Sequence, residues 1–123
     1  MARQKKTPFQ PWLSRQPDGI EKRYIRLGNS QLLHPAMLNL GKAAFKIYVY
    51  MLLESGGKVE FELPRAKYKK IVAPATFQKA VEELSEAGFI EVVQRNANIQ
   101  KPNKYRFSSG WKVKIEADRD SPP

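Results

Sequence analysis

The chain has 123 residues, no cysteine, and a formal net charge of +10 from 22 basic and 12 acidic side chains. This length predicts one domain with tails, and the absence of cysteine excludes disulfides and cysteine-ligated metal sites, as suits a cytoplasmic protein. The basic excess favours a polyanionic partner such as nucleic acid, whereas the longest apolar stretch, residues 43–53, is too short to cross a membrane.

Residues 1–22 are expected to form a flexible basic arm. Three prolines and the lack of an apolar period argue against packed structure, and the basic start does not lead into the apolar run of a secretory signal. Phe9 and Trp12 are either isolated aromatic residues of a tail or an anchor for a partner or for the folded body. The cations of the arm either enter a DNA minor groove or only raise solubility. They are Arg3, Lys5, Lys6 and Arg15.

The segment between the arm and the first long helix predicts several short elements. Residues 24–27 are expected to be an extended lead-in or a short strand, and Asn29 and Ser30 to form a turn. Residues 34–40 resemble a short helix with Pro35 at the first helical position, where its missing N–H costs nothing.

A long helix is expected to begin at residue 41 or 42 and to end at residue 54 or 55. Side chains at the spacing i, i+3, i+4, i+7 define its inward face. They are Ala44, Ile47, Tyr48 and Met51. The helix is apolar almost all round, so it must be covered on more than one side. The second cover is either the preceding segment, residues 24–40, or another copy of the chain, which would form a homodimer through residues 43–53.

Residues 59–63 alternate between apolar and charged side chains. This period of two predicts a strand with Val59, Phe61 and Leu63 on its buried face. A proline ends the strand and can open a short helix over residues 64–71.

A longer helix is predicted over residues 74–87, followed by a β-hairpin with strands over 89–95 and 104–107. Ala73 stands at the N-cap position, where it is a weak cap because it has no side-chain oxygen. Pro74 at the first helical position partly offsets this weakness by presetting φ. The predicted inward face of the helix consists of Phe77, Ala80, Val81 and Leu84.

Charges are segregated along the two predicted helices. Between Leu63 and Val81 every ionisable side chain except one tyrosine is basic. The basic residues are Arg65, Lys67, Lys69, Lys70 and Lys79, and the acidic residues Glu82, Glu83 and Glu86 follow them. Recognition helices enter the major groove with their N-terminal residues, where cations meet phosphates. The charge reversal therefore predicts that the start of the longer helix contacts DNA, while the four cations of the shorter helix bind the DNA backbone.

Residues outside the inward face of the longer helix are candidates for contacts with bases. Gln78 can pair with adenine through two hydrogen bonds, and Lys79 can reach guanine or a phosphate. Ala75 or Thr76 can touch a thymine methyl group, although Thr76 can instead satisfy backbone groups of the first turn. The hairpin loop is either a DNA-binding wing or an ordinary polar loop. The cations of this predicted wing are Arg95, Lys101 and Lys104.

Residue types that support catalysis are scarce outside the predicted tails. The only histidine, His34, stands beside a proline and is interpreted as a polar turn or surface residue. The acidic residues Glu82, Glu83 and Glu86 are interpreted as the solvated side of a helix. There is no Ser-His-Asp or Cys-His set to activate a nucleophile and no His/Cys cluster to bind zinc. We therefore expect no enzyme, no metal site and no cofactor.

The order helix, strand, helix, turn, helix, strand, wing, strand is similar to that of the winged helix-turn-helix family. Residues 24–27, the end of the apolar helix at 53–58, and the segments 76–80 and 84–90 resemble small winged-helix proteins that are common in Firmicutes and on their mobile elements. The Glu-Leu-x-x-x-Gly-Phe-Ile segment that ends at Ile90 is a widespread mark of winged-helix regulators and plasmid initiators.

This resemblance covers residues 24–111 and implies an α+β winged helix-turn-helix, with a three-helix core, a small antiparallel sheet and an extra short N-terminal helix. It implies double-stranded DNA binding by a small bacterial transcriptional regulator or a replication-associated factor. Relatives usually carry Ser or Thr where Ala73 stands and a polar or basic residue near Ala75, which implies fewer direct hydrogen bonds to DNA here.

Three parts are therefore expected: the arm at 1–22, the winged helix-turn-helix domain at 23–111 and a C-terminal tail at 112–123. The predicted partner is double-stranded DNA. Two alternatives stay open, namely a winged-helix module for protein–protein interaction and an RNA-binding protein.

Overall fold

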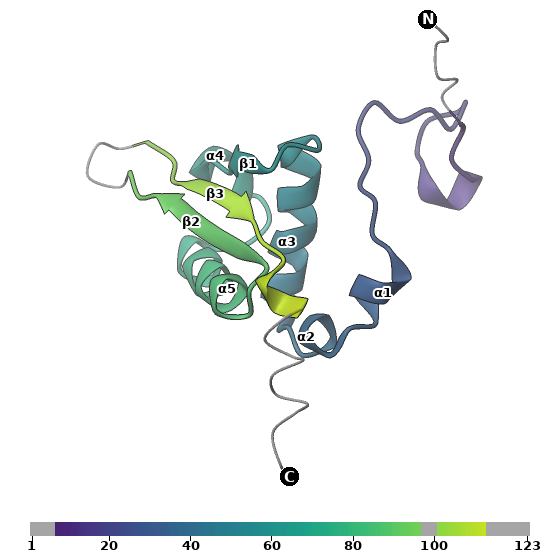
Figure 1. Cartoon of the computed structure of the whole chain (residues 1–123). Coiled ribbons are helices and arrows are strands. Elements are labelled where there is room, and N and C mark those ends of the chain that lie inside the picture. The colour runs from purple at the N-terminus through teal and green to yellow at the C-terminus, as the bar shows by residue number, and fades with distance from the viewer. Residues whose placement is uncertain (1–6, 97–100, 113–123) are drawn as a thin grey trace, which may run out of the picture.

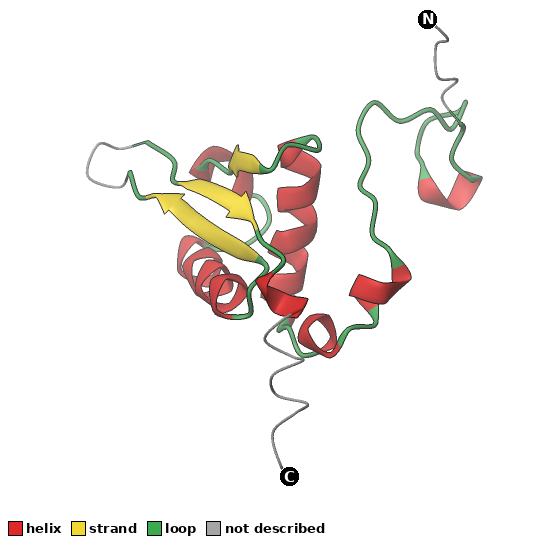
Figure 2. Ribbon diagram, viewed as in Figure 1, coloured by secondary structure: helices red, strands yellow, loops and turns green. Residues whose placement is uncertain are grey.

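The structure is a computed structural model that describes residues 7–96 and 101–112. The predicted α+β class is confirmed, because helices and a small antiparallel sheet share one core (Figures 1 and 2). The helices are η1 (Pro11–Leu13, a 3-10 turn), α1 (Asn29–Leu32), α2 (Pro35–Leu38), α3 (Lys42–Ser55), α4 (Arg65–Tyr68) and α5 (Pro74–Glu86). The strands are β1 (Glu60–Glu62), β2 (Ile90–Gln94) and β3 (Lys104–Phe107).

The sheet is antiparallel and has the order β1-β3-β2, so β3 is its central strand. Tyr105 of β3 is paired with Phe61 of β1 and is buried with it on the face that packs on the helices. On the opposite face Arg106 lies directly across from Glu60 and Glu91, and its guanidinium pairs with both carboxylates at 3.4 Å and 3.7 Å. One cation on the central strand therefore links the two outer strands.

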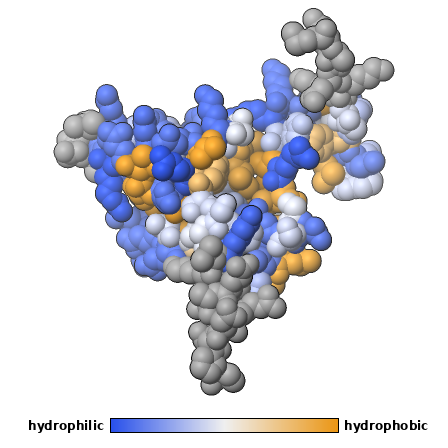
Figure 3. Space-filling model, in the orientation of Figure 1, coloured by the Kyte–Doolittle hydropathy of each residue, from blue (hydrophilic) through white to orange (hydrophobic). Residues whose placement is uncertain are grey.

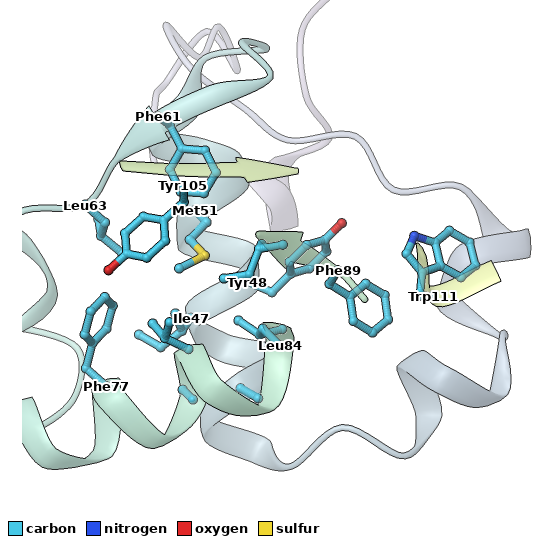
Figure 4. Packing of buried hydrophobic residues seen from close by; sticks show 14 of the residues in the cluster. Ile47, Tyr48, Met51, Phe61, Leu63, Phe77, Leu84, Phe89, Tyr105 and Trp111 are labelled. Atoms are coloured by element: carbon cyan, nitrogen blue, oxygen red, sulfur yellow. The ribbon is translucent and has the colours of Figure 1, made fainter. Parts of the chain in front are cut away.

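The core lies between α3, α5 and the inner face of the sheet (Figure 4). The inward faces predicted for the two long helices are confirmed, because all eight side chains are buried. Ile47 and Met51 of α3 meet Leu84 of α5 at the centre of this cluster, where each is fully buried. The periodicity of apolar residues had this predictive power because a helix that packs on one side must repeat its apolar positions every 3.6 residues.

Three local predictions were wrong. Asn29 and Ser30 begin the short helix α1 and do not form a turn. Val59 was predicted to be buried but is 61% exposed. The strand β1 begins only at the next residue, so Val59 lies outside the paired register. The short basic helix is one turn long, Arg65–Tyr68, and residues 69–71 continue as a turn.

His34 and Trp111 form a structural pair that the sequence did not predict. The backbone N–H of Ala36 donates to Nδ1 of His34 at 3.1 Å, so His34 caps α2 with its side chain. Its ring meets the buried Trp111 edge-on with 4.7 Å between centroids, and Trp111 stacks on Phe89. His34 is half-buried in the bend before α2, as a polar turn residue would be, and its contacts with Ala36 and Trp111 add a structural role in the fold.

The segment before α3 provides part of the second cover that this apolar helix requires. Ala36 and Met37 are buried in the core, and the Gln31 amide donates to the Tyr48 hydroxyl at 2.7 Å. Phe45 and Tyr50, however, remain 36% and 39% exposed. Residues 24–40 thus cover α3 only partly. No helix of the described residues has the length and apolar character needed to span a membrane.

Stability is expected to fall at alkaline pH because burial raises the pKa of Tyr48 and Tyr105 above the ordinary value of 10.0. The fold favours the neutral phenols, so their stabilisation is complete below pH about 10 and is lost as pH rises further. Urea unfolding between pH about 8 and 11 should show a shallower alkaline loss in Tyr105→Phe than in the native chain. Tyr24→Phe, at an exposed tyrosine, is the control, and an equal effect of both variants would contradict the assignment.

Candidate nucleic-acid interface

α4 and α5 are consecutive helices joined by residues 69–73 at one edge of the core (Figure 1). The ring of Tyr68 at the end of α4 stacks on the ring of Phe77 in α5, with centroids 3.7 Å apart and an interplanar angle of 4°. Phe77 is buried, and Ile71 and Val72 of the connection pack against the core. These contacts hold the basic helix α4 beside the first turns of α5.

The start of α5 is exposed and has no side-chain cap. Ala73 is the N-cap residue, as predicted, and no hydrogen bond from its side chain to the first turn is possible. Ala75 and Thr76 are exposed, and the first N–H groups of a helix have no partner within the helix. An exposed, uncapped helix start of this kind attracts anions such as phosphates.

Four predicted DNA-binding cations lie on α4, on the turn after it and in the first half of α5, and all four are exposed. Among the described residues no carboxylate pairs with them, although ion pairs form elsewhere on the surface. They are Arg65, Lys69, Lys70 and Lys79. Because they lack acidic partners, their charges remain available to a polyanion.

Lys67 differs from the other cations of α4. Its ammonium group forms a hydrogen-bonded ion pair with Glu54 at the end of α3, and Arg23 reaches the same carboxylate at 3.6 Å. The Glu54 side chain is 21% exposed, so this pair is partly shielded from water. The structure therefore places Lys67 in a link between α3 and α4, a contact that a charge count along the sequence does not reveal.

A groove of about 710 Å³ runs between α5 and the β2–β3 hairpin. Gln78 lines it from α5, and Arg95 lines it from the end of β2, so two residues predicted from separate segments face the same space. Ala75 also contributes, whereas Thr76 and Lys79 do not line the groove and lie further round α5. Glu82 lies in the same groove and places an acidic group beyond Gln78.

The base of the predicted wing is closed by hydrogen bonds. The Asn96 N–H donates to Oδ1 of Asn103 at 2.7 Å, and the Asn96 side chain donates to the carbonyl of Pro102 at 2.9 Å. Asn96 is only 6% exposed, so it connects the two strands as a buried group. The sequence indicated polar residues at both ends of this loop but not their pairing. The tip, residues 97–100, lies outside the described residues.

The three predicted wing cations are not equivalent. Arg95 and Lys101 are exposed at the two ends of the loop. Lys104 alternates with the buried Tyr105 on β3, so its side chain lies on the face of the sheet that also carries Arg106. Lys104 therefore lies on the opposite side of the sheet from the groove.

Glu83 is not part of the solvated side of α5 that the sequence predicted. Its carboxylate accepts a hydrogen bond of 2.6 Å from the N–H of Gly41, the N-cap residue of α3. A negative group at the start of a helix is stabilising, so Glu83 links the last turn of α5 to the start of α3. Glu82 and Glu86 are exposed as expected.

Within the described ranges no group of three or more His, Cys, Asp or Glu side chains has an arrangement that could hold a metal ion. Comparisons with known proteins add no assignment, since no protein-family model, no curated protein and no solved structure matches the chain.

Proposed function

We propose that the chain binds double-stranded DNA as a winged helix-turn-helix protein. In this proposal α4, residues 69–73 and α5 are the helix-turn-helix, and the β2–β3 hairpin is the wing. The observation that carries it is the exposed, uncapped start of α5 together with the cations of α4, the turn and α5, which have no acidic partners among the described residues.

The proposed contacts follow the geometry of that surface. Arg65, Lys69 and Lys70 bind phosphates, while the first turn of α5 enters the major groove. Gln78 and Lys79 are the proposed readers of base edges.

Arg95 and Lys101 would bind the DNA backbone beside the protein groove that lies between α5 and the hairpin. Lys67 is not among the proposed phosphate-binding residues because it is paired with Glu54. Lys104 is not among them because it lies on the outer face of the sheet.

The same interface would serve a small transcriptional regulator or a replication-associated factor. Both tasks require a protein that positions itself on duplex DNA through phosphate contacts and recognises its site through base edges or DNA shape. Alanine at positions 73 and 75 supports limited direct readout, because neither side chain can form a hydrogen bond.

Binding to a labelled duplex is expected to weaken steeply with salt. For the five cations proposed to bind the DNA backbone, the logarithm of the association constant should fall against the logarithm of salt concentration with a slope of about −4.5. Lys70→Gln should weaken binding to every duplex and reduce that slope by about 1, whereas Lys79→Gln should weaken binding and relax the preference for sequence. Fluorescence anisotropy over about 50 to 200 mM salt measures both quantities.

Lys67→Gln is the matched control, because it removes the same charge from the same region but from a lysine that is already paired. It should change DNA affinity much less than Lys70→Gln, and Lys70→Gln and Lys79→Gln should keep the native melting temperature. Equal losses for Lys67→Gln and Lys70→Gln, salt-independent binding, or stronger competition by structured RNA than by duplex DNA would each overturn the proposal.

A further inference from the structure

The N-terminal arm contains a loop that is closed on itself. The Phe9 N–H donates to the carbonyl of Gly19 at 2.7 Å, and the Ser14 hydroxyl donates to Glu21 at 2.5 Å. Residues 9–21, termed the arm loop, thus form a small ordered unit that includes η1. At its surface Trp12 is 78% exposed and Leu13 is 58% exposed. An ordered loop that displays a tryptophan and a leucine to water has the character of a docking element.

The arm loop stands apart from the helical body, and α3 lies between it and α5 (Figure 1). The residues that follow the arm loop lie near the end of α3, where Arg23 pairs with Glu54 at 3.6 Å. Within the N-terminal segment, the ring of Tyr24 meets that of Phe9 edge-on, with 5.4 Å between centroids. The arm loop is therefore directed away from the proposed DNA-binding surface of its own chain.

The side of α3 that faces away from the core is apolar and only partly covered. Phe45, Val49 and Leu53 follow one another at intervals of four residues and therefore form one stripe along the helix. Phe45, at one edge of this stripe, and Tyr50, on its other side, are 36% and 39% exposed, while Val49 and Leu53 are half-buried. These four residues are termed the α3 face. In Figure 3 hydrophobic side chains are visible on the surface between the sheet and the arm.

The charges of the two surfaces are complementary. The arm loop contains one basic residue, Arg15, and two acidic residues, Asp18 and Glu21. Its formal charge is therefore −1, whereas that of the whole chain is +10. These two acids are the only ones before Glu54 in the sequence. Beside Phe45, α3 carries Lys42 and Lys46, which form no ion pair with the described carboxylates.

We propose that a second copy of this chain covers the α3 face, and that each copy inserts its arm loop against the α3 face of the other. Trp12 and Leu13 would pack on the stripe of Phe45, Val49 and Leu53, and the acids of the loop would approach Lys42 and Lys46. Such an exchange is symmetric, so both copies bury the same two surfaces and the assembly closes as a dimer. A negatively charged loop with an exposed tryptophan fits this basic, apolar face better than it fits DNA.

In the dimer α5 and the hairpin of each copy stay uncovered. This dimer does not depend on the proposed function, because its formation requires no DNA. If both proposals hold, the dimer presents two DNA-binding surfaces.

Sedimentation of the full chain without DNA tests the proposal. Between about 1 and 500 µM the mass should rise from 14.1 kDa to twice that value. Quenching of tryptophan fluorescence by acrylamide should fall several-fold over the same range, because Trp12 becomes covered while Trp111 is already buried. A monomer at every concentration, or a Trp12 that is protected equally in the monomer, would overturn the proposal.

Two variants distinguish arm exchange from direct packing of α3 on α3. The double variant Trp12→Ser/Leu13→Ser removes the arm contact, and Phe45→Glu removes the α3 face. Neither should self-associate, but an equimolar mixture should form a weaker heterodimer, because one intact arm then meets one intact face.

Val93→Ser, at an exposed apolar residue of β2, is the control and should dimerise like the native chain. Tyr50→Ser replaces Phe45→Glu if the latter does not fold. Undiminished dimerisation of the arm variant, or failure of the folded mixture to associate, would refute the exchange.

Discussion

Phe77→Ala is expected to lower the free energy of unfolding by about 3–5 kcal/mol, the cost of truncating a buried phenylalanine. Phe77 is only 6% exposed and its ring stacks on Tyr68 at 3.7 Å. The substitution would therefore open a cavity under α5 and also release α4 from its position. Denaturant unfolding followed by circular dichroism measures the loss, and DNA affinity should fall with it because the two helices lose their mutual orientation.

Gln78→Ala is the matched control for this prediction, since Gln78 is the next residue of the same helix and is exposed. Its effect on stability should lie within about 0.5 kcal/mol, as is usual for surface substitutions. A Phe77→Ala protein with an unchanged unfolding curve would show that the faces of α5 are wrongly assigned.

Gly88→Ala is expected to destabilise the fold by at least about 3 kcal/mol, through backbone strain and a steric clash together. Gly88 ends α5 with a φ of +86°, a conformation that alanine adopts only at a cost. A Cβ atom there would lie 2.5 Å from the backbone nitrogen of Trp111 and 2.6 Å from the carbonyl carbon of Gly110. Neither atom can move without displacing Trp111, which is packed on Phe89. Thermal unfolding of the variant measures this effect.

Gly56→Ala separates the two causes. Gly56 ends α3 with a φ of +60°, but a Cβ atom there would have no heavy atom within 4 Å. Only the strain of the left-handed conformation remains, about 1–2 kcal/mol. If Gly56→Ala and Gly88→Ala were equally destabilising, the close approach of the C-terminal segment to Gly88 would be wrong.

Both long helices could be predicted from the sequence to within about one residue, together with the residues that each buries. Ala44 to Met51 in α3 and Phe77 to Leu84 in α5 repeat at helical spacing, and this pattern survives in any environment that covers one side of a helix. The β-hairpin was likewise predicted, because alternation and turn residues are local signals.

Single positions whose role depends on distant partners could not be predicted in this way. His34 has the sequence context of a polar turn, and its edge-on contact with Trp111, far along the chain, is visible only in the tertiary structure. Glu83 has the context of a solvated helix, yet it binds the N–H of Gly41, 42 residues away.

The candidate interface also has one property that the sequence determines and another that depends on the tertiary structure. The segregation of basic and acidic residues along residues 65–86 is a property of the sequence, and it determined which helix start would carry the cations. The tertiary structure decided which of those cations remain available: Glu54 neutralises Lys67, while Lys70 and Lys79 have no acidic partner among the described residues. The physical reason is that the sign of a charge belongs to its residue, whereas pairing falls off over a few ångströms and depends on chain segments that only folding brings together.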